Sequence, residues 1–152
     1  MIHLRPAQPD DAPALAALAV DVLGDALRHL PAEIAAPMVA IQARAREAGW
    51  RTRWPDHRHD ALCDGAEVVG EVRYVDLPDH RLVIDLAVIP GRRGQGIGGA
   101  VLRDLIAGAQ PRAVLLSVLA HNPAQALYRR LGFAEVDADG PYVRMRREPD
   151  PA

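Results

Sequence analysis

Residues 85–99, DLAVIPGRRGQGIGG, decide the fold of this chain, because strand-forming apolar residues run directly into a turn that holds two arginines and five glycines. Apolar side chains at helical spacing follow over residues 98–109. A strand that leads through a glycine-rich turn into a helix presents unpaired backbone N–H groups at the positive end of the helix dipole. That arrangement suits a phosphate or pyrophosphate, and Arg92 and Arg93 add positive charge beside it. A tight turn that binds no ligand is the alternative.

The same glycines match a second pattern, the G-x-G-x-x-G fingerprint of nicotinamide and flavin proteins, at Gly94, Gly96 and Gly99. A dinucleotide site needs a parallel βαβ unit and an acidic residue at the end of the following strand, which holds a ribose hydroxyl. Here the following strand ends in SVLAHN, residues 117–122, which contains no carboxylate, and antiparallel strands precede the loop. The sequence therefore disfavours a nicotinamide or flavin protein.

The N-terminal third predicts a short strand and a first helix. Residues 2–5 have the composition of a strand. Asp10 or Asp11, followed by Pro13, has the pattern of a capping carboxylate and a proline in the first helical turn. Apolar residues then recur with a period of about 3.6, which predicts an amphipathic helix.

A second helical pattern covers residues 31–49. We expect Pro37 to interrupt this helix and Gly49 to end it. Residues 50–60 are mostly polar and predict an irregular connection. Trp50 and Trp54 lie in this connection, where we expect them to anchor the second helix to the sheet.

Strand periodicity begins near residue 60. The segments on either side of Asp64-Gly65 predict a hairpin with these two residues as its turn, and residues 81–89 predict the next antiparallel strand. Residues 113–119 form the apolar run of a buried strand.

The C-terminal part predicts one further helix and two strands. Asn122 can cap a helix that Pro123 starts, and Gly132 suits the left-handed residue after its last turn. Short strands are expected near residues 134–137 and 142–146. The predicted order is thus β-α-α-β-β-β-α-β-α-β-β.

Composition predicts one globular domain without an electrostatic affinity for nucleic acid. The chain has 152 residues, 49% hydrophobic and 25% charged, and its net charge of -2 is unlike that of a basic nucleic-acid-binding domain. No stretch approaches the roughly 20 apolar residues of a membrane-spanning helix, and the N-terminal residues lack the apolar region of a secretory signal. We therefore expect a cytoplasmic protein with no membrane partner. Cys63 is the single cysteine and predicts no disulfide.

Two motifs resemble those of the GNAT acyltransferases. Residues 93–98, RGQGIG, resemble the family's acyl-CoA loop, Arg/Gln-x-x-Gly-x-Gly/Ala, which follows the fourth strand. Residues 122–133, NPAQALYRRLGF, resemble its second signature, an Asn before a helix that ends in Tyr and LGF. The resemblance implies an α/β GNAT fold, a mixed and mostly antiparallel sheet of about six or seven strands flanked by about four helices, with a splay between strands four and five. It also implies a single domain over residues 1–147, with a short polar tail at 148–152.

The resemblance implies an acetyl-CoA-dependent N-acetyltransferase that acetylates a primary amine by direct attack, with acetyl-CoA as co-substrate and no metal. The acceptor, a small-molecule or peptide amine, is expected between the 24–60 segment, the 71–76 strand end and the C-terminal hairpin. Trp50 and Trp54 fall in this region, and lining the acceptor pocket is the alternative to their role as anchors. A homodimer is usual for the family. The alternative is a non-catalytic acyl-CoA-binding or sensor module of the same fold.

The resemblance also assigns the acetyl-CoA contacts. The backbone of Val88 and Ile89 is expected to pair with pantetheine and to supply an N–H near the thioester oxygen. Asn122 is a candidate CoA contact that is also explained as a helix cap. The pyrophosphate is expected to bind the loop, whose residues are Arg93, Gly94, Gln95, Gly96, Ile97 and Gly98.

Tyr128 is the candidate general acid, because the resemblance places a phenol close to the CoA sulfur at this position. A neutral phenol, with an ordinary pKa of about 10, can protonate a departing thiolate whose conjugate acid has a pKa of about 8.5. The alternative is an aromatic residue that only packs on the inner face of its helix.

Asp85 is the leading candidate for the base that deprotonates the amine. A carboxylate in an otherwise apolar strand has its pKa raised by burial. Strand alternation predicts that Asp85 shares a face with Val83, Ala87 and Ile89.

Other assignments of the base remain open. Glu71 on the neighbouring strand, His121 or a chain of water molecules are the alternatives. The structural alternative for Asp85 is an ion pair with an arginine such as Arg73.

Overall fold

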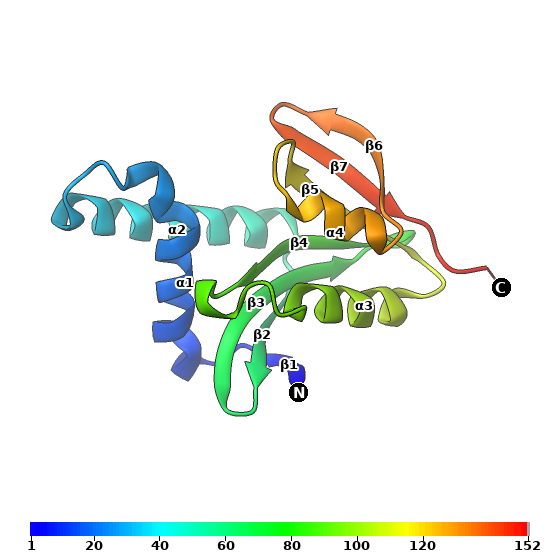
Figure 1. Cartoon of the computed structure of the whole chain (residues 1–152), viewed down its shortest axis with the longest axis horizontal. Helices are drawn as coiled ribbons and strands as arrows, with labels where there is room; N and C mark the ends of the chain where they lie inside the picture. The colour runs from blue at the N-terminus through cyan, green and yellow to red at the C-terminus, as the bar shows by residue number, and fades with distance from the viewer. Residues whose placement is uncertain (152) are drawn as a thin grey trace.

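The computed structural model describes residues 1–151, and its elements follow the predicted order (Figure 1). The strands are β1 (Ile2–Pro6), β2 (Arg58–Asp64), β3 (Glu67–Asp76), β4 (His80–Val88), β5 (Ala113–Leu119), β6 (Ala134–Asp139) and β7 (Tyr142–Arg147). The helices are α1 (Ala12–Gly24), α2 (Ala32–Arg53), α3 (Ile97–Ala109) and α4 (Ala124–Arg130). Short 3-10 turns occupy Pro9–Asp11, Asp25–Leu27 and Pro90–Arg92.

The seven strands form one mixed sheet in the order β1-β2-β3-β4-β5-β7-β6. Neighbouring strands are antiparallel except for β4 and β5, which are parallel. A parallel pair needs a crossover connection, and α3 supplies it between these two strands. This is the mixed, mostly antiparallel sheet that the sequence predicts.

The helices cover the two faces of the sheet differently. On one face, apolar side chains of α3, including Leu102 and Leu105, pack against Val72 and Val83 in the main hydrophobic core. The helix α4 lies next to α3, since Leu127 is within van der Waals reach of a Cβ built at Gly99. The helices α1 and α2 pack against each other beside the other face of β3 and β4 (Figure 1). That second face holds the candidate site.

Strands β4 and β5 separate halfway along their length. Their pairing runs only from His80–Val83 to Ala113–Leu116, although β4 continues to Val88 and β5 to Leu119. Beyond the pair Val83 and Leu116, the N–H and C=O groups on the facing edges of β4 and β5 therefore form no hydrogen bonds with each other. This is the splay expected between strands four and five.

A bulge in β4 lies where the splay begins. Arg73 of β3 is opposite Asp85, but the next residue, Tyr74, is opposite Val83, so Ile84 has no partner in the register. The extra residue reverses the alternation of side chains. Asp85 therefore lies on the opposite face from Val83, and the predicted shared face of these two residues is wrong.

The helix α2 is longer and more continuous than the sequence predicts. It passes through Pro37 without a break and extends beyond Gly49 to Arg53. A proline in a helix removes one hydrogen bond. Val39, two residues after Pro37, is buried, and its packing offsets this loss. Trp50 lies inside the helix, and the guanidinium groups of Arg46 and Arg73 each contact its ring, which links the last turns of the helix to the sheet.

Local turn details also differ from the expectation at two places. The β2–β3 turn is Gly65-Ala66 rather than Asp64-Gly65, with Gly65 at a φ of 61°. Asp11 does not cap α1 with its side chain, because its carboxylate accepts hydrogen bonds from Arg5 at 2.7 and 2.8 Å and from the Gln8 N–H at 2.8 Å.

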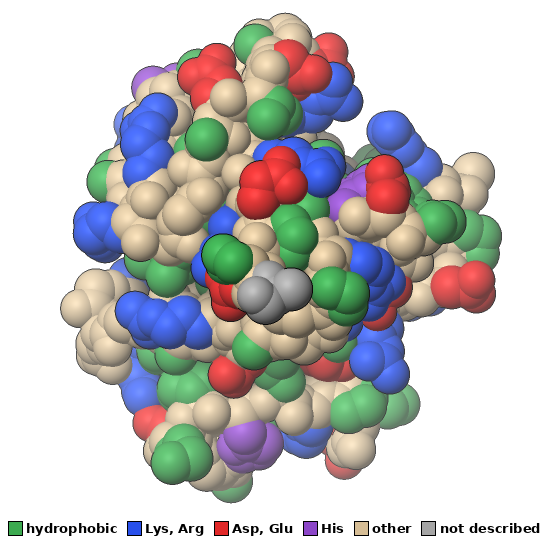
Figure 2. Space-filling view, turned by 90° about the vertical axis from the view of Figure 1, so that its right-hand side faces the viewer, with side chains coloured by type: hydrophobic (Ala, Val, Ile, Leu, Met, Phe, Trp, Pro, Cys, Tyr) green, Lys and Arg blue, Asp and Glu red, His purple; other side chains and the backbone are tan. Residues whose placement is uncertain are grey.

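The exposed surface mixes charges of both signs. Figure 2 shows arginine and acidic side chains interspersed over one end of the molecule, with apolar side chains between them. Over residues 1–151, every helix is too short or too polar to span a bilayer.

Candidate active site

The glycine loop leaves its backbone N–H groups free. Gly94 and Gly96 have φ angles of 75° and 79°, a left-handed conformation that glycine adopts without strain. Within residues 1–151, no N–H from Gly94 to Gly99 donates a hydrogen bond, and the first one in α3 that does so belongs to Ala100, which donates to Gly96 O at 3.0 Å. These amides lie at the N-terminus of α3, where they can bind an anion.

The side chains of this loop have separate roles. Ile97 is 5% exposed and belongs to the core, so only its backbone faces the loop. The Gln95 side chain accepts a hydrogen bond from Arg92 Nε at 3.0 Å. Gly98 lies near Leu127 of α4, which would be 3.9 Å from an added Cβ.

The two arginines of the loop point to different elements. Arg92 binds Asp64 at 2.5 Å and Glu67 at 3.2 Å, and thus ties the loop to the β2–β3 hairpin. Arg93 donates to the Val88 carbonyl at 3.0 Å and pairs with Asp21 of α1 at 2.5 Å. The Arg93 side chain is 51% exposed against 23% for Arg92, so it is the more available of the two for an anionic ligand.

At the end of β4, Val88 and Ile89 differ in what their backbones can do. The Ile89 N–H donates to Val69 O at 2.9 Å, within the sheet. Successive N–H groups of a strand point to opposite sides, so the Val88 N–H points away from β3 toward the splay. Val88 is therefore the member of the pair whose N–H is directed at the proposed thioester position.

Gly70 of β3 sets how closely β4 approaches at this point. Gly70 is opposite Val88, and a Cβ built on it would lie 2.3 Å from the Ala87 carbonyl oxygen. No side chain fits at that distance without a backbone shift. The absence of a Cβ at Gly70 therefore allows the backbone of Ala87 and Val88 to lie this close to β3.

Two cavities meet beneath α1. The first, which we name the helix cavity, has a volume of about 330 Å³ and lies between α1, α2 and the sheet. The second, the splay cavity, has a volume of about 240 Å³ and lies between β4 and β5. Asp85 and Val22 line both cavities. Asp85 is thus a titratable side chain placed where the two cavities adjoin.

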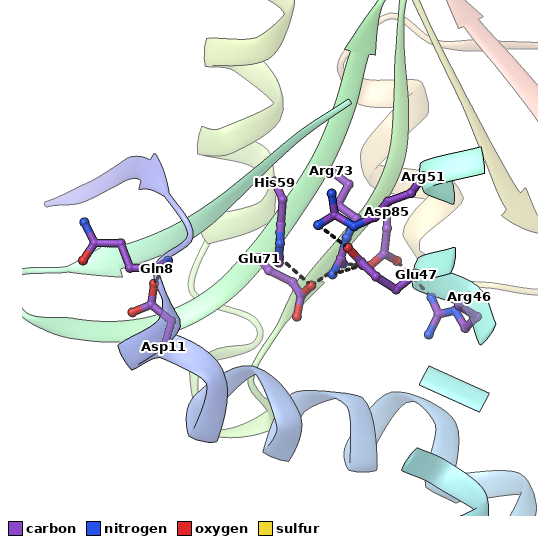
Figure 3. A network of polar contacts seen from close by, with 9 residues as sticks. All are labelled: Gln8, Asp11, Arg46, Glu47, Arg51, His59, Glu71, Arg73 and Asp85. Carbon is purple, nitrogen blue, oxygen red and sulfur yellow. Dashed lines mark hydrogen bonds and ion pairs between the residues drawn. The ribbon is translucent and has the colours of Figure 1, made fainter. Parts of the chain in front are cut away.

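The floor of the helix cavity is a charged network (Figure 3). His59, Arg73 and Asp85 are opposite one another on three neighbouring strands. Glu71 on the same face accepts hydrogen bonds from His59 Nε2 at 3.1 Å and from Arg73. Arg73 also pairs with Glu47 of α2 at 2.7 Å. The ion pair expected between Asp85 and Arg73 is present but long, at 3.5 Å.

The carboxylates of this network have opposite pKa shifts. Burial raises the pKa of Asp85, and the negative charge of Glu71 adds to this rise, which the positive charge of Arg46 opposes. Burial also acts on Glu71, but the hydrogen bond from His59 and the charge of Arg73 outweigh it and hold its pKa below the ordinary value. Glu71 is therefore a fixed anion, whereas Asp85 is the carboxylate poised to take up a proton.

Tyr128 lines the splay cavity from α4. Burial raises the pKa of its phenol, and the negative charge of Asp85 raises it further. The ring packs edge-on against Phe133 with centroids 6.0 Å apart. Tyr128 therefore stays protonated at neutral pH and remains available as a proton donor.

The remaining predicted residues differ in position. Asn122 lines the splay cavity, and its side-chain oxygen accepts a hydrogen bond from the Ala124 N–H at 2.9 Å. The N-cap of α4 is Pro123 rather than the predicted Asn122, which lies one residue before it. His121 is exposed and lines neither cavity. Glu71 lies in the helix cavity but is held as an ion pair. Of the side chains considered as the base, Asp85 alone adjoins both cavities.

Sequence reasoning places the 24–60 segment beside the acceptor but does not identify which residues of α2 line a cavity. Arg46, Glu47 and Trp50 line the helix cavity on one face of this helix. Their spacing of three and four residues signals a shared face, but no local pattern indicates that this face lies over the charged strands. Within residues 1–151, no group of three or more histidine, cysteine or acidic side chains is arranged to hold a metal ion.

A carboxylate with a raised pKa beside a neutral phenol can move two protons. Asp85 can accept one from a group in the helix cavity, and Tyr128 can donate one to a group in the splay cavity. A reaction in which one reactant enters through each cavity would use both.

Comparison with known proteins places this geometry in a family. Residues 56–135, more than half of the chain, match the family model of the acetyltransferase (GNAT) domain. None of the curated proteins matches the chain in sequence.

Solved structures share the complete fold. The PaiA N-acetyltransferase of Thermoplasma acidophilum, solved in complex with coenzyme A, has a TM-score of 0.72 at 15% identity, over 97% of this chain and 99% of that one. An acetyltransferase of Thermus thermophilus has a TM-score of 0.69 at 24% identity, over 97% and 96%. The ribosomal-protein-S18-alanine N-acetyltransferase of Escherichia coli has a TM-score of 0.67 at 19% identity, over 100% and 96%. At these identities the likeness shows the fold, which is the one predicted.

Proposed function

Because the chain belongs to the GNAT acetyltransferase family, we propose that it is an acetyl-CoA-dependent N-acetyltransferase that acetylates a primary amine by direct attack. The observation that supports this most strongly is the position of Asp85, which lines both the helix cavity and the splay cavity. An amine in the first cavity and a thioester in the second would meet at this carboxylate.

The proposed acetyl-CoA site runs from the glycine loop into the splay. The free N–H groups from Gly94 to Gly99 would bind the pyrophosphate, and Arg93 would exchange its contact with Asp21 for the phosphate charge. The pantetheine would lie along the unpaired edge of β4, where the Val88 N–H is directed. This donor would support the oxyanion that develops on the thioester carbonyl.

In the proposed chemistry, Asp85 and Tyr128 each transfer one proton. The ammonium form of the acceptor gives one proton to Asp85, and the lone pair that this leaves on nitrogen forms a bond to the thioester carbonyl carbon. The nitrogen of the resulting tetrahedral adduct gives its second proton to solvent. The carbon–sulfur bond then breaks, and the departing thiolate takes the phenolic proton of Tyr128. The products are the N-acetylated amine and coenzyme A, and solvent restores the two side chains. The raised pKa values of Asp85 and Tyr128 are the property that each role needs.

Release of free thiol from acetyl-CoA in the presence of an amine panel tests the proposed function. The chain contains no lysine, because all 18 of its Lys and Arg residues are arginine, so acetylation of its own lysines does not contribute to the signal. Tyr128→Phe should lower kcat by about 10² or more while leaving the dissociation constant of acetyl-CoA unchanged. Tyr74→Phe is the matched control, because its hydroxyl contacts Arg58 outside both cavities. Full activity of Tyr128→Phe would remove the general-acid role.

A non-catalytic acyl-CoA-binding module is the second candidate. It is favoured by the two guanidinium groups near Asp85, at 3.4 Å from Arg46 and 3.5 Å from Arg73, which give the carboxylate a structural role. Binding of acetyl-CoA without thiol release for any amine would favour this candidate. A cytoplasmic location and a homodimer remain predictions.

A further inference from the structure

Arg46 places a positive charge beside the carboxylate at the junction of the two cavities. Its Nη2 atom lies 3.4 Å from Asp85 Oδ1, which is its one ion pair within residues 1–151. The Arg46 side chain is 34% exposed and lines the helix cavity, so it keeps donors free for a ligand. Arg73, in contrast, is 10% exposed and is held by both Glu71 and Glu47.

Trp50 fixes the position of Arg46. The guanidinium groups of Arg46 and Arg73 both lie 4.8 Å from the centroid of the Trp50 ring. Such stacking restrains a side chain that otherwise has many rotamers. The free guanidinium is therefore held in place next to Asp85 (Figure 3).

The rest of the helix cavity is apolar on the α1 side and balanced in charge on the other. Leu15, Leu18 and Ala19 of α1 form part of its wall. Arg44 also lines the cavity, is exposed, and has no ion-pair partner in the described chain. The carboxylates of Glu47 and Glu71 in this cavity are already paired with arginines, so the additional ammonium groups of a polyamine would meet the unpaired charge of Arg44, which is unfavourable.

We propose that the acceptor is an apolar α-amino acid with a free carboxylate. This inference rests on the proposed function. Its amine would face Asp85, its carboxylate would bind Arg46, and its side chain would lie against α1. In an α-amino acid a single carbon separates the amine from the carboxylate group, which matches the direct neighbourhood of Asp85 and Arg46. A lysine side chain has no anion near its amine, and a peptide N-terminus has a neutral carbonyl there.

Calorimetric binding to the protein saturated with coenzyme A tests the carboxylate contact directly. The probes are L-leucine, L-leucinamide and 3-methylbutylamine, which share one apolar body and differ in the group beside the amine, together with spermidine. We expect L-leucine to bind about 10-fold or more tighter than the other three, as a charge-assisted contact to arginine predicts. Equal or weaker binding of L-leucine relative to L-leucinamide, or no binding of L-leucine, would overturn the proposal.

Arg46→Gln identifies the residue responsible. The variant should lose the preference for L-leucine over L-leucinamide and bind the amide as before. Any effect of the substitution on Asp85 acts on both probes equally, so the ratio of the two dissociation constants isolates the carboxylate contact. Arg53→Gln, on the same helix but stacked on Trp54 outside the cavity, is the matched control and should keep the preference. An unchanged preference in Arg46→Gln would assign the carboxylate to another group.

Thiol release with the same four amines separates this proposal from the proposed function. Preferential binding of L-leucine without thiol release would contradict catalysis and support the carboxylate site. Thiol release with 3-methylbutylamine or spermidine but not with L-leucine would support catalysis and overturn the carboxylate site.

Discussion

Asp85 is a partly buried carboxylate, 21% exposed, with a raised pKa, and this combination has a cost in stability and a use in chemistry. Two guanidinium groups lie at 3.4 and 3.5 Å, too far to offset the desolvation of the carboxylate. Because the pKa of Asp85 is higher in the folded than in the unfolded state, the protonated side chain stabilises the folded protein. This contribution to the free energy of unfolding is lost as the pH rises through the folded pKa. The ionised form is the form that a base needs.

Asp85→Asn should therefore separate activity from stability. As the pH falls through the folded pKa of Asp85, kcat/KM of the wild type should fall, because the base becomes protonated. The variant should lose about 10²-fold or more in kcat/KM, and its kcat/KM should not fall further as the pH is lowered through this range. Its free energy of unfolding at pH 7 should be unchanged or higher. Thiol-release profiles across pH and urea unfolding measure the two effects. A variant that keeps both the wild-type kcat/KM and its decrease at low pH would exclude Asp85 as the base.

Glu71 has the opposite character, since its pKa is lowered and its charge is paired with Arg73 and His59. Its contribution to stability is present above the unfolded pKa, near 4.5, and is lost as the pH falls through the lower folded pKa. Glu71→Gln should cost about 3 kcal/mol at pH 7, as expected when a buried pair is broken. The difference from the wild type should shrink in acid.

Urea unfolding at pH 7 and in acid measures this prediction for Glu71. Glu67→Gln is the matched control, because Glu67 forms an exposed pair with Arg92 at 3.2 Å, which contributes less than about 1 kcal/mol. Equal stability losses in the two variants would show that Glu71 has no special role in the network.

Residue-scale chemistry is partly readable from the sequence. Asp85 is identifiable because a carboxylate stands out in an apolar strand, and the structure buries it in part, with 21% of its side chain exposed. Its face is mispredicted, because the bulge at Ile84 depends on pairing with β3 and leaves no mark in the local pattern. Arg46 escapes sequence reasoning, because its importance comes from the position of α2 over the sheet.

At the scale of elements, the start of β3 and the end of β4 together shape the edge of the splay. Gly70 allows the Ala87 backbone to approach, and the strand pair directs the Val88 N–H toward the splay. The bulge and the loss of pairing with β5 occur at neighbouring residues of β4. The strand β4 therefore does two things. Its bulge places Asp85 on the face of the helix cavity, and its unpaired residues form the open edge of the splay.

Gly70→Ala should disturb this strand pair. A Cβ at 2.3 Å from the Ala87 oxygen forces a backbone shift, which we expect to cost about 1–3 kcal/mol and to weaken acetyl-CoA binding about 10-fold. Gly49→Ala is the contrasting control, since nothing lies within 4 Å of its added Cβ and alanine favours helix α2 by up to about 1 kcal/mol. Thermal unfolding and acetyl-CoA titration of both variants provide the measurements. Unchanged stability and affinity in Gly70→Ala would show that β3 and β4 adapt freely.

Helix ends are the least predictable elements. The sequence predicts that Pro37 interrupts α2 and that Gly49 ends it, but tertiary contacts of Val39 and Trp50 outweigh their intrinsic preferences. The helix α3 is well predicted, because its apolar face from Val101 to Ala109 is entirely explained by packing on the sheet.

At the scale of the whole molecule, the predicted order of strands and helices is confirmed, and the sheet has the predicted mixed topology. Periodicity and turn residues are sufficient for the order of the elements, whereas the mixed sheet is what the resemblance to the GNAT acyltransferases implies. The two cavities are not predictable in shape. They arise where α1 and α2 lie over β3 and β4 and where β4 leaves β5, and both depend on contacts between distant segments.

Calorimetric titration of acetyl-CoA into the wild type and Gly96→Asp tests the central claim most directly. Open space surrounds Gly96, and aspartate is one of the few residues that enter the left-handed region, so the variant can fold, which circular dichroism verifies. Its carboxylate would repel the pyrophosphate at the free amides of the loop. We predict one site per chain with a micromolar dissociation constant in the wild type and no detectable binding in the variant. Absence of binding to the wild type, or equal affinity in a folded Gly96→Asp, would contradict the assignment of the acetyl-CoA site.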